Sequence, residues 1–533
     1  MIDPSVRDPA GARRRTVVAV ALVAILFAYL AVAWLVEPGR HYRGIDIIDM
    51  FSIFNADDSF RYYLARQAFD LPRLFSWSYT YPAALLLDGL VLQVVGDSLL
   101  LARAVFASLA VASLVLLYRT AVLLGASSAS ALVAMILVGT MPVYAFVSMS
   151  FLGEKWLLLF SVVGLYLFAS GRVMAACLAF SVLTLVRPEG LFFITPLFLC
   201  FLSRKQLSYC AALVLPGTLY FVWLLFSLPS IDAFWHWRLE YRAYTNHLEF
   251  PHLYSPLGFL VTFNLFWILL GLSGFLLQRP KRFMLFWVGA ALVFSYHVIS
   301  TALWLEFYEP RYYAILVPLI GIFVALGLDS LVAKLWGVGH RWRMGWIVPA
   351  LMVSTILVGW AAQIDEIRRD VFSGWRFPLN HNRGVYNPGA GYDTESIGNI
   401  RAISEAIATA TRVEQVSRIF IPIQNDLFYI LDPDSLNGVR TVYLPIPYSL
   451  FADHFDGSLF GMFPYENKYA YFSLYGDDDD EARRKRGLYI GDMRDCEACV
   501  AVAKAGNIGV YQVFYHETRE PLKWPGQGSV VQE

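Results

Sequence analysis

Two adjacent carboxylates, Asp57 and Asp58, stand in the stretch FNADDSFRYYLARQAFD at residues 54 to 70. The stretch predicts a short helix in a membrane interface, on which Asp57 shares a face with Arg61 and Asp58 shares one with Tyr62. The helix dipole explains one carboxylate at the start of a helix. A second consecutive acid needs a reason of its own, and accepting a proton as a general base is chemistry that a positioned carboxylate can do.

Further charged residues border or interrupt apolar runs, where an unpaired charge is costly. Glu154 and Lys155 end the stretch SMSFLGEK, and Arg187 with Glu189 breaks the apolar sequence of LVRPEGLFF. Anchoring in lipid headgroups explains the first two as well as a site does. An ion pair with an acid on a neighbouring helix is the structural alternative for Arg187. Both interpretations stay open at this level.

A third group of charges, in WLEFYEPRYYAILVP, contains Glu306, Glu309 and Arg311. A guanidinium group binds a phosphate through two parallel hydrogen bonds, so Arg311 is a candidate phosphate ligand, with interfacial anchoring as the alternative. The loop FWHWRLEYRAYTNH contributes His236 to an aromatic and basic surface that suits a sugar or a lipid phosphate. His236 and His247 lack an acid at ligand spacing and so do not make a metal site. No cofactor is expected, and a divalent metal is not indicated.

The composition is that of a membrane protein. Of the 533 residues, 57% are hydrophobic and only 16% are charged, whereas a soluble domain is about a quarter charged. The 42 basic residues balance the 42 acidic ones, so no bulk charge points to a nucleic acid. Apolar runs of about 18 residues or more recur over the first two thirds of the chain, each long enough to cross a hydrocarbon core about 30 Å thick.

This pattern predicts a polytopic α-helical membrane protein with about 11 spans. Arg13, Arg14 and Arg15 precede the first apolar run, which predicts an uncleaved span rather than a signal peptide. Lys and Arg collect in the short connections of one side, which places the N-terminus in the cytoplasm and the charged stretches above at the outer face. The predicted spans are residues 16–36, 98–119, 126–148, 155–170, 172–186, 189–202, 207–228, 257–278, 283–304, 311–335 and 345–363.

The polar tail predicts a second domain, residues 364–533, with mixed helix and strand on the outer side of the membrane. The segments IFIPI, FYILDP, TVYLPIP and GLYIGD predict strands, and ISEAIATA predicts a helix. The charged run DDDDEARRKR at 477–486 predicts a solvated loop. Cys496 and Cys499 lack the further ligands of a zinc site, which leaves a local disulfide or two free thiols.

The stretches NADDSFRYYLARQ, FLGEKW, VRPEG and EPRYYAILVPLIG, in this order, resemble the GT-C superfamily of integral-membrane glycosyltransferases. The nearest likenesses are bacterial relatives of the protein O-mannosyltransferases and of the lipid A aminoarabinose transferases. The resemblance covers residues 1–363, implied to be the catalytic membrane domain, and would put the tail in the periplasm of a bacterial inner-membrane protein. It implies transfer of one sugar, with inversion, from a polyprenyl phosphate carrier to a cell-envelope glycolipid, polysaccharide or protein.

The resemblance also implies roles for residues. An acid of the first outward loop is the catalytic base in such enzymes, which points to Asp57 or Asp58; the usual family pair has Glu second, so the choice stays open. The leaving lipid phosphate needs cations, for which Arg311, Arg187 and Lys155 are the candidates. Substrate-binding roles fall to Glu154, Glu189, Glu309, Tyr62, Arg61 and His236.

Two other functions are compatible with a polytopic chain. A transporter or flippase of a lipid-linked glycan would carry ionisable residues near the bilayer midplane, whereas the charges here gather at one face. A polymerase or ligase of lipid-linked oligosaccharides would concentrate its functional residues in a large late outward loop, whereas the acids here come early in the chain.

Overall fold

A computed structural model of the protein describes most of the helical part and the strands of the tail. The residues described are 9–35, 56–69, 82–96, 98–227, 259–260, 263–278, 281–302, 310–338, 347–368, 407, 409, 416, 418–422, 440–444, 458–461, 470–475, 485–491, 500–505 and 508–518.

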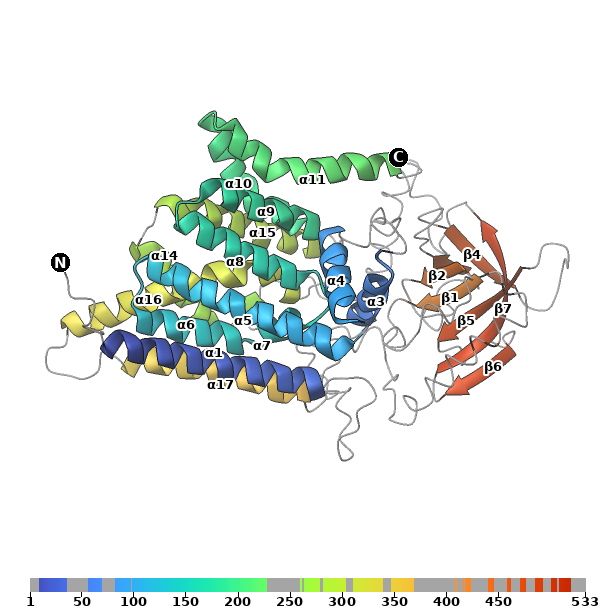
Figure 1. The fold of residues 1–533 in the computed structure, drawn as a ribbon, viewed down its shortest axis with the longest axis horizontal. Coiled ribbons are helices and arrows are strands. Elements are labelled where there is room, and N and C mark those ends of the chain that lie inside the picture. The colour runs from blue at the N-terminus through green and yellow to red at the C-terminus, as the bar shows by residue number, and fades with distance from the viewer. Residues whose placement is uncertain are drawn as a thin grey trace.

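The described part is mostly helical, with the helices gathered into one bundle (Figure 1). The helices are α1 (Pro9–Leu35), α3 (Ala56–Arg66), α4 (Pro82–Val95), α5 (Leu99–Leu123), α6 (Ser128–Thr140), α7 (Pro142–Met149), α8 (Glu154–Ala169), α9 (Val173–Val186), α10 (Glu189–Ser203), α11 (Leu207–Ser227), α14 (Leu265–Gln278), α15 (Met284–Ala302), α16 (Val317–Val338) and α17 (Ile347–Arg368), with the 3₁₀ segments η3 (Lys281–Phe283) and η4 (Pro310–Leu316).

Several of these helices are apolar enough to lie in a membrane. Within the described residues, three stretches qualify as spans by length and composition, namely Thr16–Ala33, Leu99–Leu123 and Arg311–Lys334. The pair α6 and α7 qualifies as a fourth, bent by 64°, because α7 begins at Pro142 and a proline cannot continue the hydrogen-bond ladder. Every predicted span overlaps a described helix.

Helix α4 lies where the sequence predicts no span, inside the expected outward connection 37–97. Its 14 residues give a length of about 21 Å, which is less than the thickness of a hydrocarbon core. The helix is apolar except for Asp88 and Gln93, and Asp88 is buried in the bundle. Helix α4 is therefore too short to cross the membrane by itself and is held by its contacts with neighbouring helices.

Helices α14 and α16 pack closely through small residues. A Cβ on Gly274 would collide with the backbone carbonyl of Phe323, and one on Gly327 would collide with that of Leu270. Two helix backbones approach this closely only where no side chain stands between them. These glycines therefore set the separation of the two helices.

We expect Gly274→Ala to lower the melting temperature of the purified protein, because a backbone oxygen cannot swing aside and overpacking costs about 1–3 kcal/mol. Gly139→Ala is the matched control. Its Cβ would meet only the flexible ends of Leu114 and Ile25, at 2.9 and 3.0 Å. Thermal unfolding in detergent measures both variants, and equal melting temperatures would contradict the packing argument.

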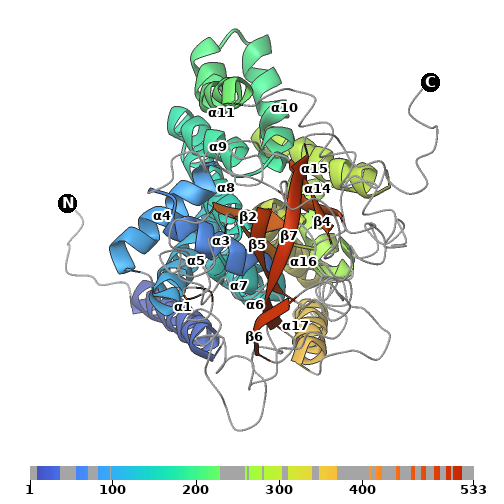
Figure 2. The ribbon, with the colours of Figure 1, turned by 90° about the vertical axis from the view of Figure 1, so that its right-hand side faces the viewer.

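The described strands of the tail form a seven-stranded mixed sheet with the order β2-β1-β5-β7-β4-β3, and β6 pairs with β7. Strand β1 is parallel to β2 and β5, and the other pairs are antiparallel. The sheet lies beyond the end of the bundle that carries α3 and α4 (Figures 1 and 2). The strands are β1 (Arg418–Pro422), β2 (Arg440–Leu444), β3 (Ser458–Gly461), β4 (Ala470–Tyr475), β5 (Lys485–Gly491), β6 (Val500–Ala505) and β7 (Ile508–Thr518).

The strand predictions for IFIPI, TVYLPIP and GLYIGD are confirmed by β1, β2 and β5. Lys485 and Arg486 begin β5, so the last part of the predicted loop 477–486 is strand, because pairing with β7 outweighs the local charge. In the predicted helix ISEAIATA, Ile407 and Thr409 are helical. The FYILDP segment, Cys496 and Cys499 lie outside the described residues.

Candidate functional site

Helix α3 carries the acidic pair and is packed inside the protein. Tyr63 and Leu64 are 1% and 0% exposed, and the helix lies against α4. Gly89 of α4 makes this contact close, because a Cβ there would stand 3.0 Å from the Cβ of Ala68. The prediction of a helix is confirmed. The side chains of Tyr63, Leu64 and Ala68, which form its apolar side, are buried inside the protein.

Asp58 is buried and bound on both oxygens. Its Oδ2 accepts a hydrogen bond from Nη2 of Arg103 in α5 at 3.1 Å, and its Oδ1 accepts one from the backbone N–H of Phe151. Both side chains of the ion pair are 1% exposed. Asp58 therefore ties α3 to α5 and to the segment before α8. Asp57 belongs to the same helix, and its side chain lies outside the described part of the structure.

The segment Ser148–Trp156, which leads into α8, connects the parts of the site. Lys155 extends toward α4, where its Nζ lies 2.6 Å from Oδ1 of Asp88. The indole N–H of Trp156 donates to the same oxygen at 2.9 Å. Lys155 is thus enclosed and paired with a carboxylate that the sequence analysis did not single out.

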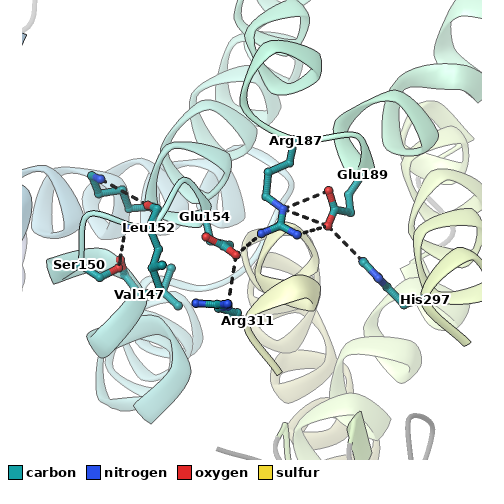
Figure 3. Close-up of polar contacts among 9 residues, drawn as sticks. Val147, Ser150, Leu152, Glu154, Arg187, Glu189, His297 and Arg311 are labelled. Atoms are coloured by element: carbon teal, nitrogen blue, oxygen red, sulfur yellow. Dashed lines mark hydrogen bonds and ion pairs between the residues drawn. The ribbon is translucent and has the colours of Figure 1, made fainter. Parts of the chain in front are cut away.

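The VRPEG joint brings Arg187 between two glutamates, as Figure 3 shows. Proline at 188 favours an extended preceding residue, and Arg187 is extended, with φ −161° and ψ 154°. Nε of Arg187 donates to the Glu189 oxygens at 3.0 and 3.2 Å, and its Nη2 lies 2.9 Å from Oε1. Its Nη1 donates to Glu154. One guanidinium group thereby holds two carboxylates that are each 1% exposed.

Arg311, at the start of η4, approaches the same oxygen of Glu154 as Arg187 does (Figure 3). Its Nε lies 3.6 Å from Oε1 of Glu154, and its side chain is 13% exposed, against 9% for Arg187. Burial acts to raise the pKa of the Glu154 carboxyl, but Arg187 and then Arg311 outweigh it and hold that pKa below its ordinary value. Two guanidinium groups thus face the buried carboxyl group of Glu154, one residue before the predicted span 155–170.

Tyr312 and His297 complete the cluster. The guanidinium carbon of Arg187 lies 4.4 Å from the centre of the Tyr312 ring and that of Arg311 lies 5.6 Å from it, which favours both cations. The ring of His297 stacks on Tyr312, with centroids 5.6 Å apart, and its Nε2 is 3.6 Å from Oε1 of Glu189.

The remaining predicted residues are placed as follows. Arg61 is half-buried on α3 and acts electrostatically on Glu154, while the buried Tyr62 packs edge-on against Phe151, with ring centres 5.0 Å apart. Glu309 and His236 lie outside the described residues. Among the described residues, no group of three or more His, Cys, Asp or Glu side chains could hold a metal ion.

Sequence reasoning missed Asp88, Arg103, His297 and Tyr312. Asp88, Arg103 and His297 shared a usable signal, since each is a polar residue within an apolar run. A charge at such a position is costly unless it is paired. Applied to every run rather than to the span ends alone, this rule would have selected these residues, although not their partners.

Comparisons with known proteins found a likeness to solved structures but none at the level of sequence families. No protein-family model matches the chain, and no curated protein matches it. Among solved structures, the chain is similar to ArnT from Cupriavidus metallidurans, whose crystal structure was determined bound to undecaprenyl phosphate. The TM-score is 0.48 and the sequence identity 12%, and the likeness covers 92% of this chain and 97% of that chain.

Proposed function

We propose that the protein is an inverting membrane glycosyltransferase that moves a single sugar from a polyprenyl phosphate carrier to a cell-envelope acceptor. The observation that carries this proposal is the convergence of the acid-bearing helix α3 and the Arg187 and Arg311 cluster on one segment, Ser148–Trp156. A base and a set of phosphate-binding cations, held near one another by contacts with the same short segment, would provide both halves of such a transfer.

In this proposal Asp57 is the base. The acceptor hydroxyl oxygen attacks the anomeric carbon while its proton passes to the Asp57 carboxylate, and the bond from that carbon to the phosphate oxygen breaks with its electron pair on the oxygen. Direct displacement of this kind inverts the anomeric centre. Asp58 is assigned a positioning role, because both of its oxygens are engaged by Arg103 and Phe151.

Arg311 is the proposed principal ligand of the donor phosphate, because it is the more exposed arginine of the cluster and makes the longer contact with Glu154. Arg187 supports it from between Glu154 and Glu189. The phosphate gains negative charge as the sugar leaves, and preorganised cations stabilise that charge most.

The remaining assignments follow from the sequence. Arg61 and Tyr62 on α3 are proposed to contact the substrates, together with Glu309 and His236. Residues 1–363 form the proposed catalytic domain, with the N-terminus in the cytoplasm of a bacterial inner membrane and residues 364–533 in the periplasm. No metal takes part in the proposed mechanism.

Purified protein reconstituted into vesicles tests the proposal. With a panel of polyprenyl phosphate sugars and a cell-envelope extract, we expect one labelled sugar to be added to an acceptor, as mass spectrometry would show. Movement of an unaltered lipid-linked sugar across the vesicle membrane without transfer would favour the flippase instead. Addition of many sugars at once would favour the polymerase or ligase.

A further inference from the structure

We propose that Asp88 and Lys155 form a positioning pair, which sets the place of helix α3 relative to the arginine cluster; this inference rests on the proposed function. Asp88 lies in the middle of the apolar helix α4 and is 2% exposed, and Lys155 is 6% exposed. Their charged atoms are 2.6 Å apart. A buried pair at this distance holds its two helices together, because separating the charges would leave each without compensation.

The ammonium group of Lys155 is enclosed by its other neighbours. It donates to the carbonyl of Leu152 at 3.3 Å and lies 4.3 Å from the centre of the Phe106 ring and 5.5 Å from that of Phe151. Aromatic faces stabilise a cation that has lost its water. These contacts assign Lys155 to holding α4 in place rather than to binding the donor phosphate.

The pair connects directly to the acid-bearing helix. Gly89 follows Asp88, and a Cβ on Gly89 would stand 3.0 Å from the Cβ of Ala68 and 3.1 Å from the Phe69 ring. Helix α4 is thus fitted against the chain immediately after α3. A shift of α4 therefore moves α3 and its two aspartates with it.

The pair connects equally to the arginine cluster, through the neighbour of Lys155. Glu154 begins α8 and binds Arg187 and Arg311, while Lys155, the next residue, binds Asp88 in another direction. Successive residues of a helix point about 100° apart, so the contacts of Glu154 and Lys155 lie in two different directions. Together they fix the rotation of the first turn of α8. Glu154 and the cations it orients are thereby held at a set distance from α3. A displacement of about 1 Å can cost about 100-fold in rate.

Three variants test this inference in full-length protein reconstituted in nanodiscs: Asp88→Asn, Lys155→Met and the double variant. We expect each single variant to lower kcat for sugar transfer at least about tenfold and to lower Tm, because one buried charge loses its partner. The double variant buries no unpaired charge, so its Tm should recover while kcat stays at least about tenfold low. Its donor KM and its affinity for undecaprenyl phosphate should stay within about threefold of wild type.

Asp329→Asn is the matched control. Asp329 of α16 accepts hydrogen bonds from the hydroxyl groups of Ser127 and Ser130, at 2.6 and 2.5 Å, and so fastens the start of α6 without touching the site. This variant should lower Tm and leave kcat within about twofold of wild type.

Recovery of kcat together with Tm in the double variant would overturn the inference, since the pair would then be merely structural. Loss of undecaprenyl phosphate binding in Lys155→Met, with the site otherwise intact, would overturn it in favour of direct phosphate binding. Failure of the wild-type protein to transfer sugar from any polyprenyl phosphate donor would instead overturn the proposed function, and this inference with it.

Discussion

Asp57→Asn is expected to lower the rate of sugar transfer by about 10²-fold to 10⁴-fold, which is the usual contribution of a general base. An amide has nearly the shape of the carboxylate but cannot take the proton of the acceptor hydroxyl. Because α3 is held by its buried face and by Asp58, the variant should fold normally. Initial rates with saturating donor and acceptor measure the loss, and the far-ultraviolet circular dichroism spectrum and Tm report the fold.

Asp58→Asn is the comparison that separates the two acids. It removes the charge that faces Arg103 in a pair whose two side chains are each 1% exposed, and breaking such a pair typically costs about 3–5 kcal/mol. We therefore expect a clear fall in Tm together with any fall in rate. If Asp58→Asn is stable and inactive while Asp57→Asn is active, the assignment of the base must be exchanged. Wild-type transfer in both variants would falsify the catalytic interpretation of the pair.

Arg311→Met should lower kcat/KM for the donor by about 10²-fold to 10³-fold, the effect commonly seen when one donor to a developing oxyanion is removed. Glu154 keeps its contact with Arg187 in this variant, so the loss of stability should be small. Steady-state kinetics with a polyprenyl phosphate sugar measure the effect. Arg311→Lys should restore only part of it, because an ammonium group lacks the paired donors of a guanidinium group.

Arg187→Met is the matched variant, and its expected defect is of another kind. Without Arg187, Glu154 and Glu189 are two buried carboxylates that have lost the cation between them. We expect a loss of about 3–5 kcal/mol of stability and poor yield of folded protein. If Arg187→Met is as stable as Arg311→Met, Arg187 is not the organising cation of the cluster.

Local sequence predicted several residues of the candidate site but not the partners with which they interact. Asp58 was selected as one of two adjacent acids, and it forms a buried ion pair with Arg103. Glu154, Arg187, Glu189 and Arg311 were selected as charges that border or interrupt apolar runs, and they form one cluster of ion pairs. Asp88 was not selected because only the charges near the ends and breaks of the predicted spans were considered, and helix α4 was not predicted. The role of Asp88 as an ion-pair partner follows only from the tertiary structure, in which Lys155 of α8 contacts it.

Two differences between the predicted spans and the described helices show what a hydropathy pattern cannot predict. The span predicted at 126–148 is two helices bent by 64° at Pro142, and α4 is a helix that the span search missed. A hydropathy window detects apolar residues but not the direction that a helix takes after a proline. It also passes over a helix shorter than the bilayer, whose burial comes from neighbouring helices rather than from lipid.

By itself the sequence predicted the helical character of the first two thirds of the chain and three of the strands in the tail. These features depend on composition and on hydrophobic periodicity, which can be read from residues close together in the chain. Only the tertiary structure decided which charges are partners. Asp58 and Arg103 are 45 residues apart, Asp88 and Trp156 are 68 apart, and Glu154 and Arg187 are 33 apart. Such pairs form only when separate helices pack against one another. Because this packing engages both oxygens of Asp58, we propose Asp57 as the base and Asp58 as a positioning acid.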